Sequence, residues 1–151
     1  MTRLLGLDLG ERRIGVALAE DDGGARPLLT LPRRSTPADD AAALAELVLR
    51  HRIDEIVVGL PLEMSGAEGA QSAVTRRWAD AVRSRLAVPF AFRDERLTSH
   101  LAASRVPPAK RGRSGGPPGR TRRDDHRARI DREAAAIILQ DELDARRESA
   151  Q

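Results

Sequence analysis

The sequence contains no cysteine and only three aromatic side chains, Trp78, Phe90 and Phe92, among its 151 residues. Without cysteine, disulfides and thiolate metal sites are excluded, so carboxylate oxygens or the three histidines must bind any metal ion. So few aromatic rings argue against recognition of nucleic acid by rows of stacked bases. Any binding of nucleic acid would therefore depend mainly on contacts with phosphate.

The chain also lacks a long hydrophobic run. Its first apolar stretch, residues 4–9, is interrupted by Asp8 and followed at once by Glu11, Arg12 and Arg13. Such a stretch is neither the hydrophobic region of a signal peptide nor a membrane span. We therefore expect a cytoplasmic protein that does not associate with membranes.

Positive charge is concentrated in one segment. The net charge is only +3, from 26 basic and 23 acidic residues, but many arginines lie between residues 105 and 129. Residues 107–123 are mostly Pro, Gly, Ser and Arg, and such a segment buries too little surface to offset its ordering entropy. We expect a mobile basic loop over about 107–127 that closes on phosphates. A coding bias toward GC-rich codons is the alternative explanation for the arginines.

The hydrophobic pattern predicts three strands followed by alternating helices and strands. Residues 4–18 are typical of two strands joined by a tight turn, and residues 27–31 of a third strand. Later strands are expected over 53–60 and 88–92. Helices are expected from Thr36 to about Arg52, from Ala70 with a buried stripe of Ala70, Val74, Trp78, Ala81 and Val82, from Thr98 or Ser99 to Pro107, and from about Ile130 to Ala145.

This order of elements fits one domain built on a mixed sheet, with helices on both faces and a hairpin at its edge. A chain of this length buries enough surface for a single core. We therefore expect a single domain over 1–146 and a disordered tail over 147–151.

Asp8 is the acid inside the first apolar strand. A carboxylate there costs several kcal/mol unless it is neutralised, meets a basic partner or holds a cation. Gly10 is expected to take the positive φ of the turn, and Gly15 to let another backbone or a phosphate approach the second strand. The alternative is an aspartate that caps its own turn.

Two further acidic positions accompany Asp8. Glu95, preceded by Asp94, follows the last strand, and Asp131 lies on the apolar stripe of the last helix, where it should face the sheet. Carboxylates that converge from distant segments hold Mg²⁺ or Mn²⁺ in phosphoryl-transfer sites, where paired ions activate water and stabilise the leaving oxygen. Taken singly, Asp131 as a helix cap and the other two acids as partners of neighbouring arginines remain alternatives.

Four stretches together carry a more specific signal. They are Asp8-Leu9-Gly10 with Arg13-Ile14-Gly15-Val16-Ala17, Ile56-Val57-Val58-Gly59-Leu60-Pro61-Leu62 with Met64 and Gly66, Asp94-Glu95-Arg96-Leu97-Thr98-Ser99, and Ile130-Asp131 before Ala134-Ala135 and Ile137-Ile138-Leu139. In this order they resemble the YqgF/RuvX family of bacterial Holliday-junction-resolvase-like nucleases.

The resemblance implies an α/β fold of the RNase H-like, RuvC type. Its mixed five-stranded sheet would have the order 3-2-1-4-5, with strand 2 antiparallel and helices on both faces. The resemblance also implies a metal-dependent nuclease, a phosphodiester hydrolase that resolves Holliday junctions or processes the 5′ end of precursor 16S ribosomal RNA. Asp8, Glu95 and Asp131 match the family's catalytic acids.

We therefore expect Asp8, Glu95 and Asp131 to be catalytic and to bind Mg²⁺ or Mn²⁺. The expected partner is branched DNA or precursor ribosomal RNA, and a homodimer is left open. The expected nucleic-acid contacts are basic residues near the first turn, the last strand and the loop: Arg12, Arg13, Arg96, Lys110, Arg111, Arg113, Arg120, Arg122 and Arg123.

Two other functions use the same features. The first hairpin also looks like the phosphate-binding hairpin of actin-like ATPases and sugar kinases, which need a duplicated second domain that 151 residues do not supply. The non-catalytic alternative is an RNA- or ribosome-associated binding module with an RNase H-like fold.

Overall fold

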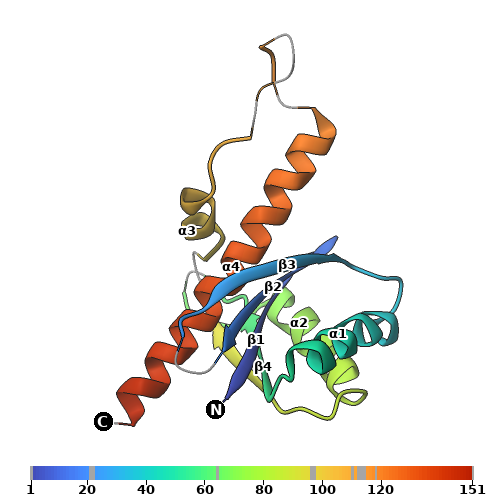
Figure 1. Cartoon of the computed structure of the whole chain (residues 1–151), viewed down its shortest axis with the longest axis vertical. Coiled ribbons are helices and arrows are strands. Elements are labelled where there is room, and N and C mark those ends of the chain that lie inside the picture. The colour runs from blue at the N-terminus through green and yellow to red at the C-terminus, as the bar shows by residue number, and fades with distance from the viewer. Residues whose placement is uncertain are drawn as a thin grey trace.

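The strands of the protein form one mixed sheet in the order β3-β2-β1-β4-β5 (Figure 1). The computed structural model describes residues 2–20, 23–63, 65–95, 98–109, 111, 115–117 and 119–150. The strands are β1 (Arg3–Leu9), β2 (Arg13–Glu20), β3 (Arg26–Pro32), β4 (Glu55–Leu60) and β5 (Phe90–Asp94). β2 is antiparallel to β1 and β3, whereas β4 is parallel to β1 and β5. The predicted strand order and the antiparallel second strand are therefore confirmed.

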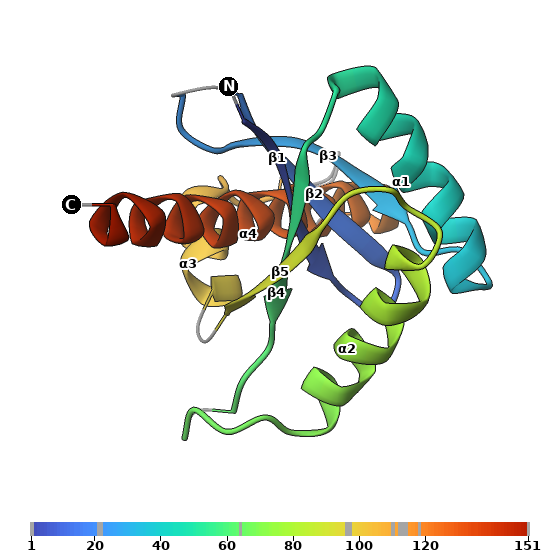
Figure 2. The same ribbon diagram turned by 90° about the horizontal axis from the view of Figure 1, so that it is seen from below.

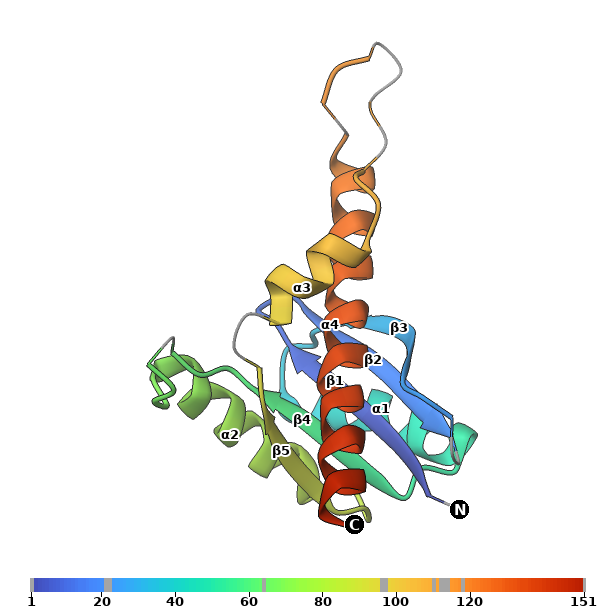
Figure 3. The same ribbon diagram turned by 90° about the vertical axis from the view of Figure 1, so that its left-hand side faces the viewer.

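The helices form a layer on each face of the sheet. They are α1 (Pro37–His51), α2 (Ala70–Arg83), α3 (Thr98–Arg105) and α4 (Arg120–Ser149). Figures 2 and 3 show α1 and α2 on one face and α4 crossing the other, with α3 beside α4. In the described parts of the chain, no helix has both the length and the apolarity needed to cross a bilayer.

The core consists of two apolar layers because side chains alternate along the central strands. On one face, Leu5 and Leu7 of β1 pack with α1 and α2. On the other face, Leu4 of β1 and Val57 of β4 pack with Ala135 and Leu139 of α4. Leu4, Gly6 and Asp8 alternate with Leu5 and Leu7 along β1. Asp8 therefore lies on the face of the sheet that α4 covers.

α1 and α2 are joined by a buried polar contact. Trp78, only 3% exposed, donates a hydrogen bond from Nε1 to Asp40 Oδ2 at 3.0 Å. Asp40 lies in the first turn of α1, where the Thr36 hydroxyl caps the helix by accepting from the Asp39 amide at 3.2 Å. The predicted start of this helix and the core position of Trp78 are both confirmed.

The predicted buried stripe of α2 was only partly right. Ala70, Val74 and Ala81 are exposed, and the buried face instead includes Ser72 and Thr75 beside Trp78 and Val82. The Ser72 hydroxyl donates a hydrogen bond to the Pro61 carbonyl, which turns this polar residue inward. A hydroxyl group that makes a hydrogen bond can be buried at little cost in free energy. The polarity of the residues alone therefore did not indicate which face of α2 packs against the sheet.

The predicted boundaries of several elements were also wrong. β5 spans Phe90–Asp94 instead of 88–92, so Asp94 lies within the strand. β4 begins at Glu55 and α3 begins at Thr98 itself. Gly10 was expected to have a positive φ but does not; its amide instead donates a hydrogen bond to the Arg13 carbonyl at 2.8 Å.

The largest difference from prediction concerns α4. This helix begins at Arg120 instead of near Ile130 and ends at Ser149, so it includes residues expected in the basic loop and in the C-terminal tail. Arginine is a good helix former, and extending a helix that packing has already nucleated costs far less than starting one. The packed residues 134–139 therefore support turns that bury little surface of their own.

Candidate active site

The side chains of Asp8 and Glu95 meet near the carboxyl ends of β1 and β5. A hydrogen bond joins the two carboxyl groups, although 87 residues separate them in the sequence. The Glu95 amide donates to the Leu60 carbonyl at 3.1 Å, which ties this residue to the end of β4. Glu95 also lies over Gly59 of β4, where an added Cβ would come within 2.8 Å of Oε2. Glycine at position 59 thus leaves room for the second carboxyl group.

The electrostatics of this pair are unusual. The pKa of Asp8 is raised to about 6: burial raises it most, the hydrogen bond from Glu95 lowers it, and the negative charge of Asp131 raises it. Burial also raises the pKa of Glu95, and the negative charge of Asp8 adds to that rise. The protonated Glu95 carboxyl then donates to the Asp8 carboxylate, so the pair holds one proton at neutral pH.

α4 brings Asp131 to the same end of the sheet. An added Cβ at Gly15 would overlap the Asp131 carbonyl oxygen, so the helix backbone rests directly on β2 at this point. Gly15 is the register partner of Asp8 across the hairpin. The prediction that Gly15 admits another backbone is confirmed. Asp131 lies well inside α4, so the alternative that it caps the helix is wrong.

The Asp131 carboxylate is paired with Arg13. Arg13 Nε donates to Asp131 Oδ2 at 2.7 Å, and each side chain is 24% exposed. The planar guanidinium of Arg13 fixes the orientation of the carboxylate it binds. One oxygen of Asp131 is therefore engaged, and the other is left as a further acceptor.

The carboxylate set fits a divalent cation in part. Two partly buried carboxyl groups that cannot both ionise without a counter-charge are the kind of site that a hard cation stabilises. However, within the described residues no three acidic or histidine side chains gather closely enough to hold a metal ion. Asp8 and Glu95 supply the core of the donor set, and Asp131 lies nearby with one oxygen on Arg13.

A basic pocket of about 400 Å³ adjoins Asp131. It is lined by Gly10, Glu11, Arg12, Arg13, Arg127 and Asp131. Arg12 and Arg13 were predicted as nucleic-acid contacts, whereas Arg127, which lines the same pocket, was not among the predicted residues. Residues four apart lie on the same face of a helix, so a prediction that began the last helix before Arg127 would have placed this arginine beside Asp131.

The other predicted contacts differ in their surroundings. Arg120 and Arg123 are exposed on the first turns of α4. Arg122 donates a hydrogen bond to the Arg111 carbonyl, and Arg111 donates to the Gly115 carbonyl at 3.3 Å, so both bind the chain before α4. The remaining predictions, Arg96, Lys110 and Arg113, lie outside the described residues.

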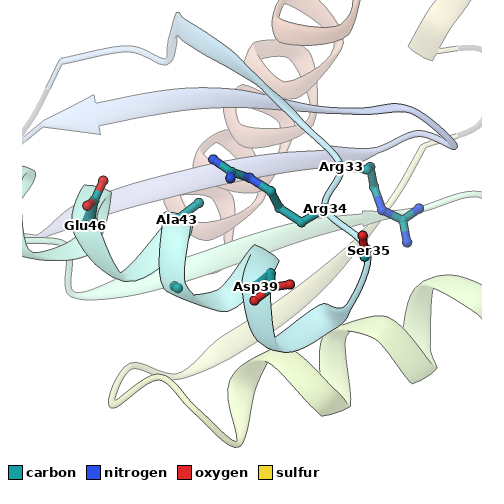
Figure 4. Close-up of a pocket in the computed structure, with 7 residues that line it drawn as sticks. Arg33, Arg34, Ser35, Asp39, Ala43 and Glu46 are labelled. Atoms are coloured by element: carbon teal, nitrogen blue, oxygen red, sulfur yellow. The ribbon is translucent and has the colours of Figure 1, made fainter.

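A larger pocket of about 680 Å³ lies on the α1 side of the sheet. Figure 4 shows Arg33 and Arg34 pointing to opposite sides beside Ser35 and Asp39. Arg33 Nη1 donates to the Gly10 carbonyl at 2.9 Å, and its Nε lies 3.6 Å from the buried Asp40 carboxylate. Both signs of charge are present, and Arg33 has structural partners, so the carboxyl pair is the better candidate site.

Comparison with known proteins identifies the family to which the chain belongs. The family model described as "RuvX: Holliday junction resolvase" matches residues 2–145. A relative from Anaeromyxobacter dehalogenans (strain 2CP-1) is 42% identical over 145 residues, covering 95% of this chain and 98% of the relative. A relative from Chloroflexus aurantiacus (strain J-10-fl) is 41% identical over 144 residues, covering 95% and 88%. Both carry the name "Putative pre-16S rRNA nuclease".

Two solved structures resemble the fold of this chain. Thermus thermophilus RuvC in complex with a Holliday junction substrate aligns with a TM-score of 0.52 and 16% identity, covering 93% of this chain and 91% of that one. A second Thermus thermophilus RuvC structure aligns with a TM-score of 0.50 and 15% identity, covering 92% of each chain. At this identity the likeness concerns the fold alone, and it confirms the predicted RNase H-like class.

Proposed function

Because the chain belongs to the RuvX family of Holliday junction resolvases, we propose that it is a divalent-metal-dependent nuclease that hydrolyses phosphodiester bonds in structured nucleic acid. Relatives that are more than 40% identical over nearly their whole length are named as nucleases, which supports enzymatic activity. The observation that carries the proposal is the meeting of the Asp8 and Glu95 carboxyl groups at the end of the sheet, where Glu95 lies over Gly59.

Mg²⁺ or Mn²⁺ would be held by Asp8 and Glu95, with Asp131 as the third carboxylate. When bound, such an ion supplies Lewis-acid activation of the phosphodiester and a more acidic attacking water. Glu95 must lose its proton before its oxygens can act as ligands, so binding of the metal releases a proton. Arg13 orients the Asp131 carboxylate, and Arg12 and Arg127 offer guanidinium groups to a phosphate in the adjoining pocket.

We propose the 5′ end of precursor 16S ribosomal RNA and the Holliday junction as the two substrates to compare. The names of the relatives favour the RNA, and the family description favours the junction. Carboxylate-bound metals act on either backbone, and phosphate contacts carry no base identity. A cytoplasmic location fits both substrates.

The second candidate is a binding module without catalysis. The ion pair between Arg13 and Asp131 favours it, because this contact engages one oxygen of the third carboxylate. In that case the fold would bind nucleic acid, and the carboxyl pair would have no role in hydrolysis.

Cleavage assays with matched junction, flap, single-stranded DNA and precursor RNA under Mg²⁺ and Mn²⁺ test both candidates. Asp8→Asn should lower cleavage by more than about 100-fold while the fold and nucleic-acid binding persist. Glu95→Gln and Asp131→Asn should cost about as much, as expected for residues that act as a unit.

Asp80→Asn is the matched control, because it removes one carboxylate from a 63% exposed position on α2, away from the site. It should cleave like the wild type. Near wild-type cleavage by Asp8→Asn with Mn²⁺ would remove Asp8 from the mechanism. Binding without cleavage of any substrate by the wild type would favour the binding module.

A further inference from the structure

The first turns of α4 project past the sheet. Figures 1 and 3 show the helix continuing well beyond the strands at the end where β1 finishes. β3 still reaches the helix at Ala128, whose carbonyl accepts a hydrogen bond from the Thr30 hydroxyl at 2.6 Å. The arginines before that point, Arg120, Arg122, Arg123 and Arg127, are all exposed. This half of α4 therefore presents its side chains beyond the core.

Helical geometry separates these arginines into two opposite faces. Arg120, Arg123 and Arg127 are spaced i, i+3 and i+7, and Asp131 follows at i+11, so all four share one face. The opposite face carries Arg122, Asp125, His126 and Arg129, which line a pocket of about 350 Å³ with the chain segment 107–109. Only the first face is continuous with the candidate active site.

We name Arg120, Arg123 and Arg127 the arginine track. Arg127 lines the pocket that also contains Arg12, Arg13 and Asp131, so the track begins at the site itself. From Asp131 to Arg120 the helix rises about 16 Å, and one strand of duplex carries about five phosphates over that length. Each arginine of the track thus has a backbone phosphate within reach.

We infer that the arginine track is a phosphate-binding surface that guides one strand of the substrate along α4 into the site formed by Asp8, Glu95 and Asp131. The inference rests on the proposed function and adds a direction to it, since the strand leaves the site toward the N-terminal end of α4. The positive end of the helix dipole at Arg120 adds to the attraction. Asp124 lies on the flank of the same face and opposes it.

A pair of double variants with equal loss of charge tests the track. Arg123→Ala with Arg127→Ala removes two track arginines, whereas Arg122→Ala with Arg129→Ala removes two from the opposite face. Binding to a fluorescent duplex with a single-stranded tail is measured in EDTA, so that no cleavage occurs, over a series of KCl concentrations. All four positions are exposed, and alanine favours helix, so both double variants should fold; circular dichroism checks this.

The track variant should flatten the slope of log affinity against log salt by about 1.8 on duplex, or about 1.4 on a single strand. The control should change the slope by less than half as much. Asp124→Asn should tighten binding at low salt. Each of these changes follows from phosphate contacts on one face of the helix.

Equal effects of the two double variants would overturn the track, because only net charge would then matter. An unchanged salt slope in the track variant would also overturn it. If the sedimentation of that variant changed at the same time, the face would instead be assigned to contact with a second copy of the protein. These outcomes are independent of catalysis. Cleavage by the wild type together with an unchanged slope rejects the track alone, whereas a flattened slope without any cleavage rejects the proposed nuclease alone.

Discussion

Asp8 and Glu95 destabilise the metal-free protein for the same reason that they suit a cation. Both carboxyl groups are partly buried, and the charge of one disfavours ionisation of the other. The folded protein therefore keeps a proton on Glu95 that the unfolded chain releases above its ordinary pKa of 4.5. Because the native state binds more protons than the unfolded state, stability falls as the pH rises beyond that value. This contribution is fully favourable only below pH 4.5.

Glu95→Gln should therefore stabilise the metal-free protein at pH 7 by about 1 to 3 kcal/mol. The amide cannot ionise, and its NH₂ group still donates a hydrogen bond to the Asp8 carboxylate. Urea denaturation in EDTA at pH 5, 7 and 8 measures the effect. The wild type should lose stability across this range, and the variant should lose less.

Asp80→Asn serves again as the control, because its carboxylate is exposed and its loss should leave the pH profile unchanged. Identical pH profiles for Glu95→Gln and the wild type would mean that Glu95 is already ionised in the folded protein. The interpretation that Asp8 and Glu95 share one proton at neutral pH would then be wrong.

At the level of elements, the decisive contact is that between α4 and the sheet. Glycines at positions 6, 15 and 59 face this helix, and a Cβ at any of them would press against its atoms. At Gly6 the nearest would be the Leu139 Cβ, at 2.8 Å. Close approach of the helix brings the Asp131 backbone onto β2 beside Asp8. The geometry of the carboxylates thus depends on the absence of side chains at these three glycines, which allows α4 to lie close to the sheet.

Gly15→Ala should displace α4, because the new methyl group would overlap the Asp131 carbonyl oxygen. We expect a loss of about 1 to 3 kcal/mol in unfolding free energy, as for an overpacked core, and a fall in cleavage of more than about tenfold. Denaturant unfolding and cleavage rates, measured on the same preparation, provide the two readouts.

Gly119→Ala is the comparison for this variant, since an added Cβ there meets nothing within 4 Å. It should change unfolding free energy by less than about 1 kcal/mol, because it affects only the exposed end of the helix. If Gly15→Ala behaves like Gly119→Ala, the close approach of α4 does not position Asp131.

For the whole molecule, the proposed metal site links ligand binding to stability. A cation that binds the folded protein alone adds about 2.7 kcal/mol at a concentration of 100 Kd. In a protein of this size that amount corresponds to a rise in Tm of about 5 to 10 °C. The rise should be seen with Mg²⁺ or Mn²⁺ relative to EDTA in the wild type.

Asp8→Asn should abolish most of this rise in Tm, because it removes a proposed ligand and a negative charge that would attract the cation. Thermal unfolding followed by circular dichroism, with KCl adjusted to equal ionic strength, measures the difference. Asp80→Asn should retain the full rise. An equal shift in Asp8→Asn and the wild type would move the metal away from the pair.

The sequence by itself determined the elements whose signals are local. The alternation of apolar residues and the Thr36 cap depend on neighbours within one or two turns, so the strands and the start of α1 were predicted from local signals. The strand order is not a local property, and its correct prediction came from the family resemblance. Trp78 was predicted in the core for the same reason. The three carboxylates were identified as candidates because each lies at the end of a strand or on an apolar stripe.

Only the tertiary structure decided how the distant residues meet. The contact between Asp8 and Glu95 and the pairing of Arg13 with Asp131 join segments about 90 to 120 residues apart. Such contacts depend on how closely α4 rests on the sheet, which is a property of packing and not of spacing. The start of α4 at Arg120 was missed because its first turns bury little surface, and the packed half of the helix supports them.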